Sequence, residues 1–252
     1  MPNDALSRRN ALTLAGAALA AGCAPALPKA ALAATPPTSA ALPPTPPSLA
    51  GAHAVAPLPF AAGSLRGISE SMITSHHENN YAAAVRNLNR VEQELAQVKA
   101  DTPPFVVAAL RERELGFRNS KALHEAYFAN LGGDGKRAGA IDGALAQAYG
   151  AAARWEEHLR ATGMGLGGGS GWVVLTLELD TGALRTVGAG NHTQALAAGV
   201  PLLVMDMYEH AYQMDYGAKT AAYLDAFMAN VRWEEVDRRF DRARRASAAL
   251  RA

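Results

Sequence analysis

Three histidines and one aspartate stand out as the residues that could perform chemistry: His76, His124, Asp206 and His210. Asp206 and His210 are four residues apart, and the other two histidines fall in upstream segments with helical periodicity. Imidazole nitrogens and a carboxylate oxygen suit redox-active first-row metals such as iron and manganese. Four protein ligands would leave a position for water and an approach for a small anion. The sequence therefore predicts an open mononuclear metal site.

Three helices are expected upstream of Asp206, because apolar residues recur there at helical spacing. They cover residues 69 to about 98, about 105–131 and about 141–162. Ser69 can cap the first, which stops near residues 101–104, Asp-Thr-Pro-Pro. The second stops at residues 132–135, Gly-Gly-Asp-Gly. Two of the candidate ligands therefore lie on two different helices.

The apolar period changes to two after a glycine-rich run at residues 163–171. Because this run lacks a Gly-Lys-Ser/Thr ending and precedes a strand, we interpret it as a helix-to-strand connection and not as a phosphate-binding loop. Strands are expected at residues 172–178, 184–189 and 202–205, and helices at about 216–231 and 234–249. Asp206 would then directly follow the third strand.

The first 33 residues have the features of an export signal. Arg8 and Arg9 precede an uncharged run at residues 11–21, and small residues follow before Ala34. The run is too short and too rich in alanine to span a bilayer core of about 30 Å. We therefore expect residues 1–33 to be a cleaved twin-arginine signal peptide, no transmembrane helix, and a periplasmic location.

The single cysteine, Cys23, leaves a second interpretation of this leader open. Residues 20–23, Ala-Ala-Gly-Cys, form a weak lipoprotein box, and cleavage there would leave a lipid anchor on Cys23. Cleavage after Ala33 would instead leave a mature protein without cysteine. Its stability would then come from a core and not from disulfides.

A linker and two folded regions are expected after the leader. Residues 34–56 are rich in Pro, Ala, Thr and Ser, which disfavours packed structure. The helical residues 57–139 and the mixed residues 140–252 follow. The leader holds three positive residues and one negative, so its removal changes the formal charge from +1 to −1. A near-neutral chain lacks the charge pattern for nucleic acid, and no nucleic-acid partner is expected.

Residues 57 to about 244 resemble the iron/manganese superoxide dismutases in the order and spacing of several motifs. These are Pro57-Leu58-Pro59-Phe60, the His76 helix with Asn87-Leu88-Asn89, the His124 helix, Gly169-Ser170-Gly171-Trp172, the Asp-x-x-Glu-His-Ala-Tyr block from Asp206, Asp215-Tyr216, Tyr223-Leu224 and Trp233. The resemblance implies an α+β fold: an N-terminal helical hairpin followed by an α/β domain with a three-stranded antiparallel sheet. It also implies that His76, His124, Asp206 and His210 bind one Fe or Mn ion per subunit.

Further roles follow from the same resemblance. Trp172 corresponds to a tryptophan that packs beside the metal, while Tyr208 and Phe128 stand where the family has two other tryptophans. Glu209 corresponds to a glutamate that crosses a dimer interface to the metal-binding histidine of the other subunit, here His210. The expected assembly is a homodimer with an isologous interface.

The gateway to the metal departs from the family pattern. The family has a histidine four residues and a tyrosine eight residues after the first ligand, and these positions hold Asn80 and Ala84. A second tyrosine that bonds this histidine across the dimer is replaced by Gln213. Asn80 and Gln213 are therefore candidates for a replaced pair. Tyr81, next to Asn80, either supplies a phenol to the entrance or belongs to the core.

The residue that tunes the metal also departs from the pattern. Family members place a glutamine against the metal-bound solvent, near Ser120 or near Asn191 in this numbering, and neither place clearly holds one. If a gap of one residue is allowed, His192 occupies the position near Asn191 and could donate its N–H to the metal-bound solvent. Gln194 is the alternative donor. Because this donor sets the redox potential, the choice between iron and manganese stays open.

The expected activity is disproportionation of superoxide to dioxygen and hydrogen peroxide. One alternative is a catalytically silent relative that keeps its metal for structural reasons, because the gateway has changed. The other is a different metal-dependent oxidation, which a larger pocket at Ala84 would favour.

Overall fold

The structure is a computed structural model that describes residues 46–252. The predicted signal peptide, Cys23 and most of the predicted linker lie outside the described residues. Among the described residues, no helix is long and apolar enough to cross a membrane.

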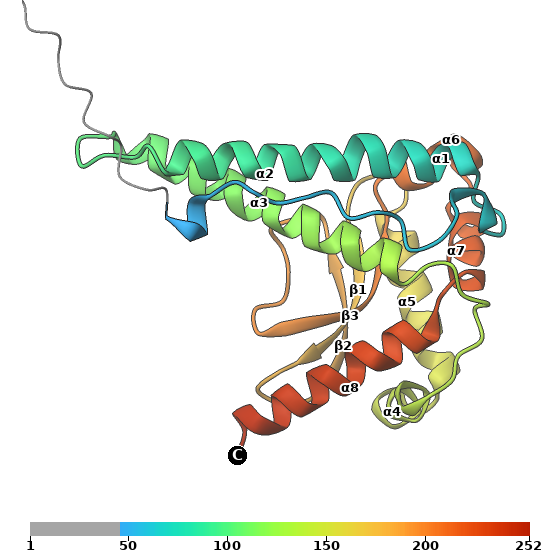
Figure 1. The fold of residues 1–252 in the computed structure, drawn as a ribbon. Coiled ribbons are helices and arrows are strands. Elements are labelled where there is room, and N and C mark those ends of the chain that lie inside the picture. The colour runs from blue at the N-terminus through green and yellow to red at the C-terminus, as the bar shows by residue number, and fades with distance from the viewer. Residues whose placement is uncertain (1–45) are drawn as a thin grey trace, which may run out of the picture. The chain divides into compact units, whose positions relative to one another are not determined.

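The N-terminal half is a helical hairpin (Figure 1). The first arm runs through α1 (Glu70–Ser75), a π-helical segment (His76–Tyr81) and α2 (Ala82–Leu95). Ser69 caps it by accepting a hydrogen bond from the Met72 N–H at 3.1 Å. The second arm is α3 (Pro104–Ala129). Both arms agree with the predicted helices, and the first stops three residues earlier than expected.

The predicted third helix is two helices, α4 (Ala140–Tyr149) and α5 (Ala152–Leu166). Gly150 separates them with a left-handed φ of 83°. A residue in this conformation ends a helix and turns the chain, and only glycine adopts it without steric cost. The single continuous helix that periodicity predicted was therefore wrong at this glycine.

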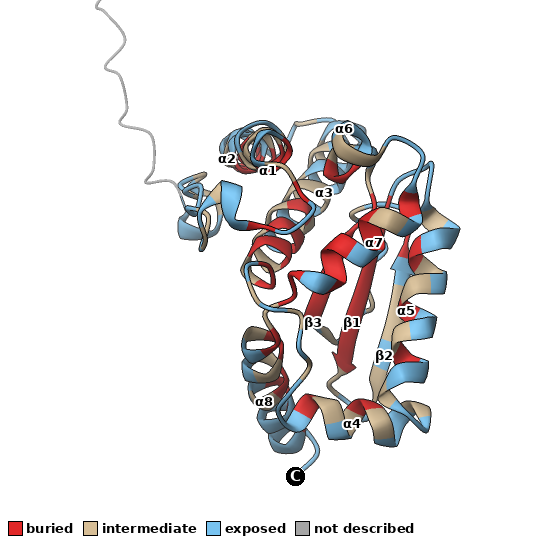
Figure 2. Cartoon of the chain, turned by 90° about the vertical axis from the view of Figure 1, so that its right-hand side faces the viewer, coloured by how far each residue is buried: buried red, intermediate tan, exposed pale blue. Residues whose placement is uncertain are grey.

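The sheet is three-stranded and antiparallel, as predicted, and the structure gives its strand order as β2–β1–β3. Its strands are β1 (Trp172–Glu178), β2 (Leu184–Ala189) and β3 (Gly199–Asp206). The central strand β1 is buried on both faces, whereas β2 is partly exposed (Figure 2). The register pairs Trp172 with Asp206, so the predicted aspartate ligand lies beside the predicted aromatic neighbour.

Three helices complete the chain: α6 (Gln213–Tyr216), α7 (Thr220–Ala229) and α8 (Trp233–Leu250). The helix predicted from Tyr216 begins at Thr220, because Gly217 has a φ of 53° and interrupts it. Helix α5 packs on β1 and β2, and α8 packs on β1 and β3.

One hydrophobic core joins the hairpin to the α/β half. It contains Ile73, Tyr81 and Leu123 from the hairpin together with residues of all three strands, such as Leu175 and Val204. This shared core holds the two helices that carry histidines against the sheet that carries Asp206.

Contacts with α2 begin before the predicted linker boundary at residue 56. Gly51 and His53 form hydrogen bonds with Asn89 and Glu92 on α2, and Ala56 does so with Tyr81. This segment runs alongside α2 in Figure 1. Its low-complexity composition hid the contacts, because the bonds use mainly backbone groups of the segment.

Candidate metal centre

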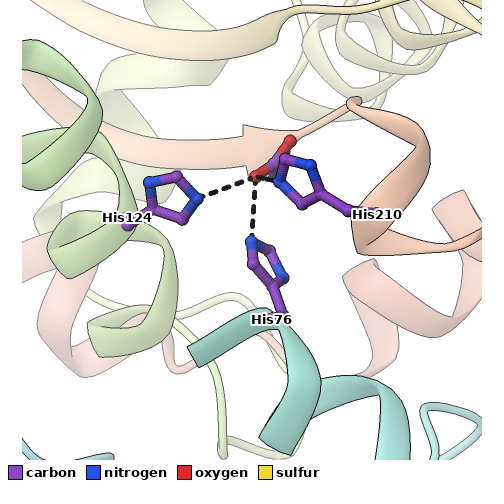
Figure 3. Close-up of side chains that lie close together, drawn as sticks. His76, His124 and His210 are labelled. Atoms are coloured by element: carbon purple, nitrogen blue, oxygen red, sulfur yellow. Dashed lines mark hydrogen bonds and ion pairs between the residues drawn. The ribbon is translucent and has the colours of Figure 1, made fainter. Parts of the chain in front are cut away.

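The four predicted ligands converge at one place, with one ligand atom of each within 4.8 Å of the others. The Asp206 Oδ2 atom lies 3.1 Å from His76 Nε2, 3.3 Å from His210 Nε2 and 3.7 Å from His124 Nε2. Figure 3 shows the three imidazoles pointing toward this carboxylate oxygen from three separate chain segments. Four residues from three distant parts of the sequence thus present two kinds of ligand atom to one point.

Each ligand has a different structural support. His76 begins the π-helical segment, an irregularity that is frequent at functional sites. His124 lies on α3, and Asp206 is the last residue of β3. His210 lies on a 3-10 turn, Glu209–Ala211, directly after that strand.

Asp206 is held by hydrogen bonds on both its carboxylate and its backbone. The Tyr208 N–H donates to Oδ1 at 2.8 Å, and the Tyr223 hydroxyl donates to the backbone carbonyl at 2.7 Å. Two positions upstream in β3, the Val204 N–H donates to the Asn130 side chain at 2.9 Å. These contacts leave Oδ2 directed at the three imidazoles.

Burial determines the charge states of the ligands. It lowers the pKa of His76 below its ordinary value and that of His124 to about 3. Burial alone would raise the pKa of Asp206, but the neighbouring His210 and His76 rings hold it below its usual range. At neutral pH His76 and His124 are therefore neutral and Asp206 is ionised, the forms that bind metals.

Several buried nitrogen atoms in this site have no hydrogen-bond partner, which fits a metal. Neither ring nitrogen of His76 is bonded, and His124 Nε2 is also without a partner. The His124 Nδ1–H donates to the Ser120 carbonyl at 2.7 Å, which leaves the Nε2 lone pair free. Buried polar atoms are almost always bonded, so these nitrogens have the chemistry and the position of ligands.

The open side of the site is lined by His210, Tyr208 and His192. The His210 side chain is 26% exposed, while Asp206 is completely buried. The Trp172 Nε1–H donates to His192 Nδ1 at 2.9 Å, so a neutral His192 carries its proton on Nε2. Burial lowers the pKa of His192, which favours this neutral form. His192 therefore carries an N–H group that does not bond Trp172, and its role as the donor to metal-bound solvent stays a prediction.

Aromatic rings pack this donor and the ligands. The Tyr208 ring stacks on His192 with centroids 5.0 Å apart, and the Phe128 ring lies 5.1 Å from that of His76. Burial raises the pKa of Tyr208 to about 12, so its phenol stays neutral.

The residues at the altered gateway do not form one cluster within the chain. Asn80 is half-buried and Gln213 is exposed, and within residues 46–252 neither side chain forms a hydrogen bond. Ala84 is buried. The Tyr81 side chain is 1% exposed, and its hydroxyl bonds Glu125 and the Ala56 N–H.

The alternatives for the tuning residue are separated by their contacts. The Gln194 side chain accepts a hydrogen bond from the Gly190 N–H at 2.7 Å, within its own loop. The His192 ring instead stacks on Tyr208, and its centroid lies 6.4 Å from that of the His124 ring. Of the two alternatives, His192 is thus the one whose ring lies beside a ligand.

Sequence reasoning missed Asn130 and Glu125, which support the ligands. Asn130 is fully buried after the end of α3, where its position before Gly132-Gly133 indicated only a helix stop. Glu125 follows His124, but nothing in its spacing showed that it would bond Tyr81. Both roles depend on chain segments that are distant in sequence.

Comparison with known proteins identifies the family. Residues 137–239 match the family model of the C-terminal domain of iron/manganese superoxide dismutases. An iron superoxide dismutase of Cupriavidus metallidurans is 46% identical over 185 residues, covering 73% of this chain and 94% of the relative. The chain belongs to the iron/manganese superoxide dismutase family. Among other family members, an iron enzyme of Aquifex pyrophilus is 32% identical over 197 residues, covering 75% of this chain and 91% of that protein.

Family members named for manganese also match. A manganese superoxide dismutase of Halobacterium salinarum is 29% identical over 192 residues, covering 74% of this chain and 94% of that protein. The predicted family and fold class are confirmed. Within residues 46–252, one four-residue group is available for one Fe or Mn ion per subunit.

Proposed function

We propose that this protein is an exported, homodimeric superoxide dismutase that acts with one iron or manganese ion per subunit. The main support for this activity is that ligand atoms of four residues lie within 4.8 Å of one another: His76, His124, Asp206 and His210. Buried ring nitrogens of His76 and His124 also have no hydrogen-bond partner. The relatives named as superoxide dismutases support the substrate.

The chain would perform three tasks in the reaction, in which two superoxide ions and two protons yield dioxygen and hydrogen peroxide. A bound iron or manganese ion supplies a one-electron couple between trivalent and divalent states. The four ligands hold that ion, and the buried Asp206 carboxylate offsets part of its charge. His192 offers an Nε2–H donor at the open side, held in that tautomer by Trp172.

The proton supply differs from the family pattern, because Asn80 and Ala84 cannot exchange protons near neutral pH. His192 and Tyr208 are the titratable side chains on the open side that are not ligands, and their rings stack on each other. Burial raises the pKa of Tyr208 to about 12, so its phenol stays protonated near neutral pH. We therefore assign proton delivery to water ordered by the His192 N–H. The Tyr81 phenol is committed to Glu125 and the Ala56 N–H.

The dimer and the export route rest on separate supports. Glu209 is exposed, and within residues 46–252 it forms no side-chain hydrogen bond or ion pair. It is thus free to reach His210 of a second subunit. The predicted twin-arginine leader supports export, and superoxide crosses membranes poorly because it is an anion.

Metal loading and activity test the function directly. The mature chain is loaded with iron and with manganese separately, its metal content is measured, and superoxide removal is assayed for each form. Activity with either metal supports the proposal and identifies the cofactor. Stoichiometric metal without activity in both forms would contradict it and would favour the silent structural relative.

Sedimentation tests the assembly. The parent should sediment as a dimer, whereas Glu209→Ala should shift toward monomer at low micromolar concentration because it removes two symmetric contacts. Glu234→Ala, on α8, is a matched control that should stay dimeric. A monomeric parent would contradict the homodimer.

A further inference from the structure

Residues 51–56, named here the N-terminal strap, lie alongside α2 and are bonded through Gly51, His53 and Ala56. Asn89 accepts from the His53 N–H at 2.8 Å and donates to the His53 carbonyl at 2.9 Å. The Gly51 N–H donates to Glu92 at 3.0 Å. The His77 ring donates to the Ala56 carbonyl at 2.8 Å. Figure 1 shows this strap extending from the start of the described chain toward α1.

Tyr81 connects the end of this strap to both ligand-bearing helices. Its hydroxyl accepts a hydrogen bond from the Ala56 N–H at 2.8 Å and donates one to Glu125 Oε1 at 2.7 Å. Burial raises the pKa of Tyr81 to about 12, so the phenol keeps the proton that it donates. Tyr81 lies five residues after His76 in the first arm, and Glu125 lies next to His124 in the second. One hydroxyl thus bridges the two arms beside their ligands.

Glu92 makes a second bridge farther from the ligands. It is 2% exposed and accepts hydrogen bonds from the Gly51 N–H, the His53 ring and Arg118 on α3, the last at 2.6 Å. The two bridges resist sliding of one arm along the other. Only the Tyr81 bridge is close to the imidazoles, since the Tyr81 and His124 ring centroids are 6.1 Å apart.

We propose that Tyr81 and Glu125, fastened by the N-terminal strap, are positioning residues that set the spacing of His76 and His124 at the metal. The two imidazoles come from different helices, so their separation depends on the relative position of the helices. Contacts behind the ligands commonly tune metal affinity and electronic structure. The inference rests on metal binding by the proposed site and does not require superoxide turnover.

Two substitutions at Glu125 separate this role from a general effect on stability. Glu125→Gln and Glu125→Ala both lose the ion pair with Lys121, whose Nζ lies 2.9 Å from Glu125 Oε1. Only the glutamine keeps an oxygen that can accept the Tyr81 proton. In the iron-loaded protein, Glu125→Ala should change the electron paramagnetic resonance spectrum of Fe(III) and weaken azide binding at least threefold. Glu125→Gln should retain the parent spectrum and azide affinity within twofold.

Tyr81→Phe tests the other end of the bridge, with Asn89→Ala as its control. Both variants remove strap contacts and should lower the melting temperature, but only Tyr81→Phe should alter the spectrum and azide affinity. If the spectra and azide affinities of Glu125→Ala and Tyr81→Phe both match the parent, the positioning role is wrong. Should Tyr81→Phe fail to fold, the Glu125 pair decides, because that side chain is one-third exposed. A metal-loaded parent without superoxide activity would overturn the proposed function and leave this comparison intact.

Discussion

His76 and Asp206 are completely buried side chains whose polar atoms face each other. Their atoms lie 3.1 Å apart, yet the His76 nitrogen has no hydrogen bond. A buried histidine nitrogen that has no hydrogen bond, next to a buried carboxylate, lowers the stability of a protein core unless another group binds both. A metal ion that accepts both lone pairs removes this cost, so each ligand should be indispensable for metal binding.

His76→Ala should therefore lower metal affinity about 100-fold or more, beyond the loss typical for residues behind the ligands. Metal content after dialysis against a competing chelator measures this. His158→Ala removes an exposed histidine of α5 and should retain the parent metal content. Equal metal content in the two variants would exclude His76 as a ligand.

His192 should matter for turnover more than for metal binding, because its Nδ1 accepts from Trp172, which leaves the proton on Nε2, and His192 does not belong to the ligand set. We expect His192→Ala to bind metal stoichiometrically and to lose about 100-fold in turnover, the magnitude typical of a positioned proton donor. Steady-state superoxide removal by the metal-loaded variant measures the effect. Unchanged turnover would assign the donor role elsewhere.

At the scale of elements, the site depends on how α3 meets β3. Asn130 follows α3, and its side chain accepts the Val204 N–H and donates to the Tyr127 carbonyl at 3.0 Å. Its backbone carbonyl also accepts the Arg232 N–H at 2.9 Å. One buried residue thus ties the His124 helix to the Asp206 strand and to the start of α8.

Asn130→Ala should destabilise the protein by about 1–3 kcal/mol, because it leaves the buried Val204 N–H without an acceptor. Urea unfolding of the metal-free protein measures this change. Asn87→Ala, at an exposed position of α2, should change the free energy of unfolding by less than about 0.5 kcal/mol. If Asn130→Ala lowers the free energy of unfolding by no more than this control, Asn130 does not hold β3 to the end of α3 as assigned.

At the scale of the whole molecule, a shared core keeps two histidines neutral by burial. The folded-state pKa of His76 and of His124 is lowered from 6.5, the latter to about 3. Below pH 6.5 the unfolded chain binds protons at these residues while the folded chain does not. Stability is therefore lost as the pH falls from 6.5, and Asp206 adds no change above about pH 5 because it is ionised in both states.

The metal-free protein should therefore lose up to about 1.4 kcal/mol per pH unit for each of the two histidines below pH 6. Urea unfolding at pH 7, 6 and 5 gives the slope. His124→Gln should remove the share of His124 and reduce the slope. A metal-free parent with the same stability at pH 7 and pH 5 would show that these imidazoles are not buried neutral groups.

The elements themselves were largely predictable. Helical spacing identified both hairpin arms, and period-two runs identified β1 and β2, because these patterns record which face of each element is buried. The failures occurred at Gly150 and Gly217, where a left-handed backbone ends a helix that apolar periodicity would continue. The contacts of the strap were also missed. They are formed by backbone groups of the strap with side chains of α2, and the amino-acid composition of the strap does not indicate such contacts.

The sequence by itself determined the ligand types and their family, since His76, His124, Asp206 and His210 keep the identity and order that the metal chemistry requires. Only the tertiary structure decided that Tyr81 bonds Glu125 and the strap, that Asn130 holds β3, and that His192 receives the Trp172 N–H. The physical reason is distance along the chain. Ligand identity is a property of each side chain, whereas a hydrogen bond between segments depends on how the shared core places both partners.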